Sequence, residues 1–262
     1  LTAIHINAGG IPESPLYANR FPAGAVDNYL AESWTINTNI TIGSFRAPRS
    51  NFMASAEQSF LDELSEAVGK DPIDFRLELL EKAGQNPVGE NNEYDAERYA
   101  GVLKLVKEKS NWGSSENGLS RGVSAYFCHN SYAAQVLDMK WENDKPIIEK
   151  VTCAIDCGIV INPDAATNLC EGGIVDGIGN AWYGELPFKD GLPEKSNFDR
   201  YQMIRMSEAP REIDVHFVQN DIDPTGLGEP TFPPIFAALA NALYKATGKR
   251  YYHQPFNSRE PV

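Results

Sequence analysis

The sequence predicts an α+β fold, in which helices pack on antiparallel or mixed sheets. Three observations indicate it. Helical periodicity occupies the chain from residue 51 to about residue 109, β-rich segments begin after residue 117, and a run of small and apolar residues near the C-terminus is typical of a buried helix. We expect an irregular and helical part over residues 1–115 and an α+β part over residues 116–262.

The first forty residues are rich in Gly, Pro and Asn, and they predict irregular structure with one short strand at "WTINTNIT", residues 34–41. A helix is expected from Asn51, closed by Gly69 as a left-handed terminator. Apolar residues recur there at every fourth position and predict its buried stripe: Phe52, Ala56, Phe60, Leu64 and Val68.

Two further helices follow. The second has Asp71 as its N-cap, Pro72 at its first position and Gly84 at its end. The third is predicted from apolar spacing, with lysines near its C-terminal end, where the helix dipole favours them. Its expected buried residues are Tyr99, Val102, Leu103 and Val106.

Beyond residue 117 the segments "GVSAYFCHN", "AAQVLDMKW" and "IIEKVTCAI" predict strands, with "ENDKP" as the turn of an antiparallel hairpin. "REIDVHFVQ" alternates apolar and polar residues, the pattern of a half-buried strand. The last helix is expected to begin at Pro233 and Pro234, to end at Gly248 and to be buried, because alanines make most of its circumference small.

Composition excludes some classes of partner. The chain has 262 residues, a formal net charge of −13 and a pI near 4.8, so it would repel phosphate backbones, and nucleic acid is not expected to bind. No stretch approaches the roughly 20 apolar residues of a membrane span. The opening "LTAIHINAGG" lacks a signal-peptide pattern and is expected to enter a longer chain midway.

Neither the cysteines nor the histidines predict a metal site. No Cys-x-x-Cys pair occurs, which argues against zinc and against an iron–sulfur cluster in this chain, and buried free thiols are favoured. The histidines are scattered without metal-ligand spacing, and no chemistry is assigned to them. These residues are Cys128, Cys153, Cys157, Cys170, His5, His129, His216 and His253.

The glycine cluster "EGGIVDGIGNAW" suggests a dinucleotide motif, but Trp182 stands where the third glycine would be required, so a nicotinamide site is disfavoured. Two interpretations stay open for Gly172 and Gly173 and for the glycines after them. They permit either close helix packing or the close approach of a flat cofactor.

Two charged residues are candidates for function. Arg46 lies in a loop just before the first helix, where it is either a solvated side chain or part of an anion site built with backbone amides. Glu229, in "GLGEP", is the best single candidate for acid–base chemistry, because its flanking glycines let a ligand approach. A plain turn is the alternative. Asp156 and Asn162 are expected to fix a turn after a strand.

Three long segments carry a resemblance to a known family: "GSFRAPRSNFMASAEQSFLDELSEAVGKDPIDFRLELL", "AIDCGIVINPDAATNLCEGGIVDGIGNAWYGEL" and "GLGEPTFPPIFAALANALYKATGK". In order and spacing they resemble the molybdenum-binding subunit of the xanthine dehydrogenase and aldehyde oxidase family, and most of all its isoquinoline 1-oxidoreductase β-subunit branch. The resemblance runs from about Trp34 and matches only the C-terminal part of such a subunit. It implies that upstream elements of the site lie outside this chain.

The resemblance also implies roles for residues of an α+β molybdopterin-binding domain. Glu229 matches the general base that takes a proton beside molybdenum. The positions expected to lie against the cofactor, molybdopterin in its cytosine dinucleotide form, are Phe45, Arg46, Ala47, Gly172, Gly173 and Gly228. Pro48 departs from the family pattern, so a substrate-stacking aromatic residue is not expected there.

The function that the resemblance implies is oxidative hydroxylation of an N-heteroaromatic or aldehyde substrate with water-derived oxygen. Electrons would leave through a separate small [2Fe-2S] subunit, and the upstream part of the large subunit would be a further partner. On this view the chain is an oxidoreductase fragment that is inactive alone. The alternative is a non-catalytic fragment or degenerate paralogue that serves as an assembly module.

Overall fold

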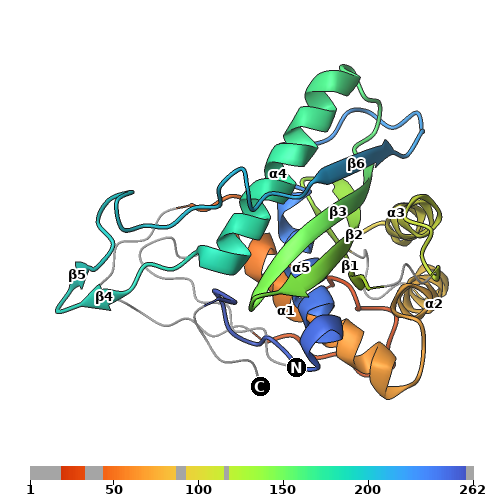
Figure 1. The fold of residues 1–262 in the computed structure, drawn as a ribbon. Helices are drawn as coiled ribbons and strands as arrows, with labels where there is room; N and C mark the ends of the chain where they lie inside the picture. Colours follow the sequence, from red (N-terminus) through yellow and green to blue (C-terminus); the bar gives the residue numbers. More distant parts are fainter. Residues whose placement is uncertain (1–18, 33–43, 87–92, 115–117, 258–262) are drawn as a thin grey trace.

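The computed structural model describes residues 19–32, 44–86, 93–114 and 118–257. At its centre is a four-stranded sheet in the order β1-β2-β3-β6, with helices on both faces (Figure 1). Its strands are β1 (Ser120–Cys128), β2 (Ser131–Glu142), β3 (Lys145–Asp156) and β6 (Glu212–Phe217). The first three are antiparallel, and β6 pairs parallel to β3. The predicted mixed sheet and the hairpin predicted at "ENDKP" are therefore confirmed.

Both hairpin turns of the central sheet use left-handed residues. His129 and Asn130 join β1 to β2 with φ of 52° and 59°, and Asn143 and Asp144 join β2 to β3 with φ of 51° and 58°. Two-residue turns with positive φ at both positions match the right-handed twist of paired strands. Asn and Asp tolerate this conformation better than most residues, and His does so to a lesser degree. The turn in "ENDKP" is thus where the sequence predicts it.

The last helix, α5 (Phe232–Thr247), covers one face of the sheet. Every residue from Phe232 to Leu243 is buried. Close packing on β1 depends on Gly122, because a Cβ added there would lie 2.1 Å from the Ala238 carbonyl oxygen. Prolines begin the helix and Gly248, at φ 72°, ends it, as the sequence predicts.

The opposite face is covered by α3 (Ala96–Lys109), with α2 (Pro72–Gln85) packed against it. All four predicted core residues of α3 are buried. The Asp71 side chain caps α2 by accepting hydrogen bonds from the Ile73 and Asp74 amides, and the helix ends one residue after Gly84. Because α2, α3 and the sheet share one hydrophobic core, residues on both sides of the predicted boundary at 115/116 pack together. The two-part division itself stays a prediction.

The first helix, α1 (Ser50–Ala67), exists, but its predicted buried stripe is wrong. Phe52 is 47% exposed, and Val68 lies beyond the helix and is 56% exposed. The face turned inward is largely polar and includes Asn51, Ser55, Gln58, Asp62 and Ser65. Its polar groups have fixed partners, including Arg250 on Asp62 and Gln254 on Ser55. Burial of polar groups is tolerated when each is hydrogen-bonded, so periodicity of apolar residues misidentified this face.

The helix α4 (Pro163–Tyr183) lies against α5, and its N-cap is Asn162, whose side chain accepts from the Ala165 amide. After α4 the chain forms an arm that carries the short hairpin of β4 (Phe188–Lys189) and β5 (Leu192–Pro193), which projects from the body (Figure 1). The strand predicted at residues 34–41 lies outside the described residues. Within the described ranges, no helix is both long and apolar enough to cross a membrane.

Candidate functional site

Three segments that are far apart in the sequence meet at the N-terminal end of α5, and Arg46 joins them. Its Nε and Nη2 donate to the Gly228 carbonyl oxygen at 2.9 and 2.5 Å. Its Nη1 donates to Asp176 Oδ2 on α4 at 3.1 Å and to the Gly172 carbonyl at 3.4 Å. Arg46 therefore connects the loop before α5 to the helix α4, and these contacts are called the Arg46 clasp. The interpretation of Arg46 as a solvated side chain is wrong. An anion site at Arg46 stays a prediction.

The loop that carries Arg46 is rigidly attached to α1. Ala47 is 1% exposed and has φ 54°, and Asn51 Nδ2 donates to the Arg46 carbonyl at 3.0 Å. Phe45 remains 49% exposed, with its ring edge-on to Phe232 at a centroid distance of 5.8 Å. Of the three loop residues predicted to meet a cofactor, Phe45 presents an exposed surface, whereas Ala47 is buried in the protein.

The α4 glycines separate into two groups. A Cβ at Gly173 would lie 2.3 Å from Thr231 Oγ1, and one at Gly177 would lie 2.2 Å from Ile235 Cγ2. These glycines serve close helix packing, one of the two interpretations left open by the sequence. Gly172 and Gly228 differ, because nothing lies within 4 Å of a Cβ added at either position. Two open backbone positions thus lie beside the Arg46 guanidinium.

Glu229 has a partner that sequence reasoning missed. Its Oε2 contacts Nε2 of His129, the first residue of the β1–β2 turn. The two side chains are 30% and 55% exposed, so the pair is accessible to solvent. The spacing of the histidines carried no signal for this contact. The signal available was the dipeptide His-Asn between two β-rich segments, which marks a turn at the end of the sheet.

The loop before α5 is fixed to the same turn. The Gly226 amide donates to the His129 carbonyl at 3.1 Å, and Ser131 Oγ donates to the Gly226 carbonyl at 2.5 Å. A Cβ at Gly226 would lie 2.6 Å from the His129 Cβ. The first glycine of "GLGEP" therefore admits the histidine, while Gly228 is the glycine with open space.

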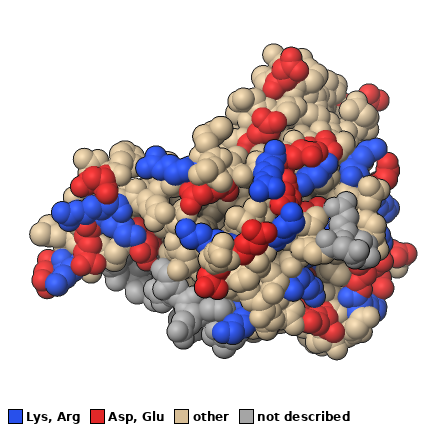
Figure 2. Space-filling model, in the orientation of Figure 1, with Lys and Arg blue, Asp and Glu red and all other residues tan. Residues whose placement is uncertain are grey.

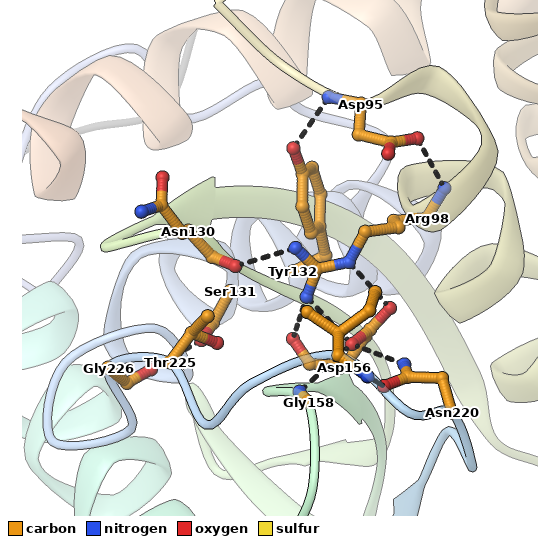
Figure 3. A network of polar contacts seen from close by, with 11 residues as sticks. Asp95, Arg98, Asn130, Ser131, Tyr132, Asp156, Gly158, Asn220, Thr225 and Gly226 are labelled. Carbon is orange, nitrogen blue, oxygen red and sulfur yellow. Dashed lines mark hydrogen bonds and ion pairs between the residues drawn. The ribbon is translucent and has the colours of Figure 1, made fainter.

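A second arginine, Arg98, is hydrogen-bonded to the β1–β2 turn (Figure 3). Arg98 on α3 donates from Nη1 to the Asn130 carbonyl at 2.9 Å, and it binds Asp156 through Nε at 3.0 Å and Nη2 at 2.8 Å. Asn220 and the Gly158 amide also donate to Asp156 Oδ1. Burial opposes ionisation of Asp156, but these hydrogen bonds outweigh it and hold the pKa of its carboxyl below the usual range. Asp156 fixes the turn after β3, as predicted, and it also anchors α3.

The cysteines form no disulfide. Cys153, Cys157 and Cys170 are buried and Cys128 is half-buried, close to the predicted pattern. Burial raises the pKa of the Cys153 thiol to about 12, so it remains neutral at ordinary pH. Within the described ranges, no group of three or more His, Cys, Asp and Glu side chains could hold a metal ion.

Charge on the visible face of the molecule is mixed. Figure 2 shows Lys and Arg interspersed with Asp and Glu over this face. Several of these charges form ion pairs, including Arg211 with Glu149 and Lys150 with Glu212. Over the whole sequence the 36 acidic residues outnumber the 23 basic ones, which gives the net charge of −13.

Comparison with known proteins defines the class. Residues 80–210 match the family described as molybdopterin cofactor-binding domain, and the chain belongs to that family. The matched residues include Gly172 and Gly173, whereas Arg46 and Glu229 lie outside them. The resemblance to the molybdenum-binding subunit of the xanthine dehydrogenase and aldehyde oxidase family is thereby confirmed.

Individual proteins of known name are also similar to this chain. A membrane-bound aldehyde dehydrogenase [pyrroloquinoline-quinone] of Gluconacetobacter polyoxogenes is 29% identical over 248 residues, 90% of this chain and 31% of that protein. Isoquinoline 1-oxidoreductase subunit beta of Brevundimonas diminuta is 29% identical over 206 residues, 76% of this chain and 25% of that protein. The chain thus spans less than a third of the length of either relative.

A solved structure shares the fold. The aldehyde oxidoreductase from Desulfovibrio gigas superposes with a TM-score of 0.64 at 14% identity, over 86% of this chain and 42% of that one. At this identity the likeness concerns the fold alone. It confirms the predicted α+β class with a mixed sheet and packed helices.

Proposed function

We propose that this chain forms the C-terminal part of the large subunit of a molybdenum hydroxylase, with Glu229 as its general base. The observation that carries the proposal is the convergence at the start of α5. There the Arg46 clasp joins the first loop, the α4 glycines and the "GLGEP" loop, and the accessible Glu229 carboxylate lies one residue from the clasped Gly228 carbonyl. Catalytic groups must be held on rigid supports to be effective, and this arrangement provides them.

The residues around Arg46 fit a molybdopterin. Gly172 and Gly228 leave backbone open to a flat ligand, and Phe45 offers an exposed aromatic surface. The Arg46 guanidinium lies beside these open positions and is paired with Asp176 at 3.1 Å. Gly173 and Ala47 support the site from inside the protein. The space around Gly173 is occupied by other protein atoms, and Ala47 is buried. The proposed cofactor is the cytosine dinucleotide form, which when bound supplies the two-electron acceptor for the reaction.

In this proposal the chain's own residues bind, orient and accept a proton. Glu229 takes the proton from the water-derived oxygen that attacks an electron-poor carbon of the substrate. A positioned base of this kind contributes about 10²- to 10⁴-fold to a rate. Arg46 fixes the loop that carries the base, and the buried start of α5 keeps that loop from moving. The substrate class is an N-heteroaromatic compound or an aldehyde, supported by the names of the relatives.

The proposed partners are the remainder of the large subunit and a small [2Fe-2S] subunit that carries electrons away. The first is supported by length, because this chain covers 31% and 25% of the two relatives described above. The second is supported by the isoquinoline relative, which is named as a subunit beta. A non-catalytic assembly module is the second candidate, favoured by the fact that Arg46 and Glu229 already have partners within the chain.

The substitution Glu229→Gln in the full-length protein with its partner subunit separates these candidates. The amide keeps the size of the side chain but cannot accept the proton, so turnover should fall by at least about 100-fold while molybdenum and pterin contents remain unchanged. Glu142→Gln, at the exposed end of β2, is the matched control and should retain wild-type turnover. Unaltered turnover in Glu229→Gln would show that another group is the base. A wild-type protein without molybdenum and pterin would favour the assembly module.

A further inference from the structure

We propose that His129 is a positioning residue for Glu229: its Nε2–H donates to the carboxylate and fixes the direction in which the base points. This inference rests on the proposed role of Glu229. The contact joins Nε2 to Oε2 across 100 residues of sequence. The contact uses Oε2, and the Glu229 side chain is 30% exposed, so the carboxylate is accessible.

The backbone holds the imidazole in place. His129 has φ 52°, the left-handed conformation that a two-residue hairpin turn requires and that His, Asn and Asp adopt more often than most other residues. The turn is anchored by Arg98, which donates to the Asn130 carbonyl (Figure 3). It is also anchored by the Gly226 amide, which donates to the His129 carbonyl. Unusual backbone conformations persist where surrounding contacts over-determine them, and they concentrate at functional sites.

The chemistry of His129 and Glu229 decides which of the two donates the hydrogen bond. An ionised carboxylate only accepts hydrogen bonds, so the ring nitrogen that contacts Glu229 must carry the hydrogen. This requirement fixes Nε2–H as the tautomer in the neutral imidazole. The donor then holds the carboxylate in one orientation, which is what a positioning residue must do. Gly226 is needed for this contact, because a side chain at position 226 would collide with the His129 Cβ.

The test uses His129→Asn and His129→Gln in the holoenzyme of full-length protein and partner subunit. Asn tolerates the left-handed turn but is too short to reach Glu229, so it removes the contact and preserves the backbone. We expect kcat to fall about 10- to 100-fold, the effect of losing a hydrogen bond to a charged group, with KM within about twofold of wild type. His129→Gln places a donor amide at similar reach and should recover most of this loss.

Two controls make the result specific. His253→Asn, at an exposed position outside the β1–β2 turn, should leave kcat unchanged. The double variant His129→Asn with Glu229→Gln should be no slower than Glu229→Gln alone, because a positioning residue acts only through the base. As a readout independent of turnover, amide exchange of residues 226–229 should be faster in His129→Asn than in wild type.

The outcomes separate this inference from the proposed function. Wild-type kcat in His129→Asn, together with a slow Glu229→Gln variant, would overturn the positioning role and leave the base in place. An additive loss in the double variant would also overturn it. Equal losses in the Asn and Gln variants, accompanied by loss of molybdenum, would reduce His129 to a structural residue of the turn. A fully active Glu229→Gln variant would refute the base, and the positioning role with it.

Discussion

The Arg46 guanidinium and the Gly228 carbonyl form a two-donor contact, at 2.9 and 2.5 Å, between residues 182 positions apart. This contact holds the residue immediately before Glu229. The same guanidinium binds Asp176 on α4, so one side chain sets the relative positions of a loop, a helix and the candidate base. The planar guanidinium has several donors in a fixed geometry, and Lys cannot replace it there.

The first prediction follows from this geometry. Arg46→Lys keeps the charge but cannot span Gly228 and Asp176 together, so the loop should open more often. We expect amide exchange at residues 226–229 to rise about tenfold, corresponding to roughly 1.4 kcal/mol for the lost hydrogen bonds. Arg211→Lys is the control, because Arg211 is 65% exposed and pairs with Glu149 at the surface. Unchanged exchange in Arg46→Lys would show that the clasp is dispensable.

The second prediction separates packing from cofactor binding by substituting adjacent glycines. Gly173→Ala should destabilise the protein by about 1–3 kcal/mol, since its Cβ would collide with the buried Thr231. Gly172→Ala meets no atom within 4 Å and replaces a glycine inside a helix, so it should stabilise α4 by up to about 1 kcal/mol. Thermal unfolding of the full-length protein measures both effects.

The cofactor content of the Gly172→Ala variant adds a second measurement. If a flat cofactor approaches the open backbone there, the variant should be stable and yet contain less molybdenum and pterin than wild type. A stable Gly172→Ala variant with full cofactor content would place the cofactor elsewhere. The Gly173 variant cannot give this answer, because its folding defect would lower cofactor content for any mechanism.

Local signals in the sequence predict most of the fold. Caps, terminators and turns such as Asp71, Gly248 and Asn143 act over a few residues, and each is found as expected. The inner face of α1 could not be predicted, because its polar residues are buried only through partners such as Arg250, far along the chain. Apolar periodicity identifies a buried face only when that face is apolar.

In the candidate site, too, some residues could be predicted from the sequence and others could not. The residues of the Arg46 loop and the "GLGEP" loop are found from the sequence through resemblance to a family, and the structure brings them together. His129 could not be found, because its contact with Glu229 depends on the register of β1 with β2 and on how the loop before α5 folds over the turn. No local pattern contains that information.

The third prediction concerns the buried pair of Arg98 and Asp156, whose side chains are 14% and 2% exposed. Asp156→Asn leaves the guanidinium without its counter-ion and should destabilise the protein by about 3 kcal/mol, as breaking a buried pair does. Replacing both residues by apolar ones of similar size should cost less than either single change. Equal or larger loss in the double variant would contradict the ion-pair account. Denaturant unfolding of the full-length protein provides the measurement.

Acid should weaken the same pair. The pKa of Asp156 is lowered from 3.8 in the folded protein, so the unfolded chain binds a proton first as the pH falls. The stabilisation from this group is therefore complete above about pH 5 and is lost as the pH falls below 3.8. Asp156→Asn should show a smaller loss of stability than wild type over that interval. An identical acid profile in the variant would assign acid sensitivity to other carboxyls.

The last prediction uses two glutamates of α1 with opposite behaviour. Burial is the main cause that raises the pKa of Glu57 from 4.5 to about 7, against the attraction of Arg20. A hydrogen bond from Tyr244 is the main cause that lowers the pKa of Glu66. The Glu57 carboxyl is thus favoured in its neutral form by folding, whereas the Glu66 carboxylate is favoured in its charged form.

The two carboxyls change the stability of the protein with pH in opposite directions. For Glu57 the folded protein retains a proton that the unfolded chain has lost, so its stabilisation is complete below pH 4.5 and is lost as the pH rises through 7. Glu57→Gln cannot ionise, and it should therefore raise the thermal midpoint at pH 8 with little effect at pH 4.5. Glu66→Gln, on the same helix, should lower the midpoint at pH 8 and should lose that effect in acid, because the stabilisation from a lowered pKa is present only above the unfolded value. If both variants shifted the midpoint in the same direction at pH 8, burial of Glu57 would not control its ionisation.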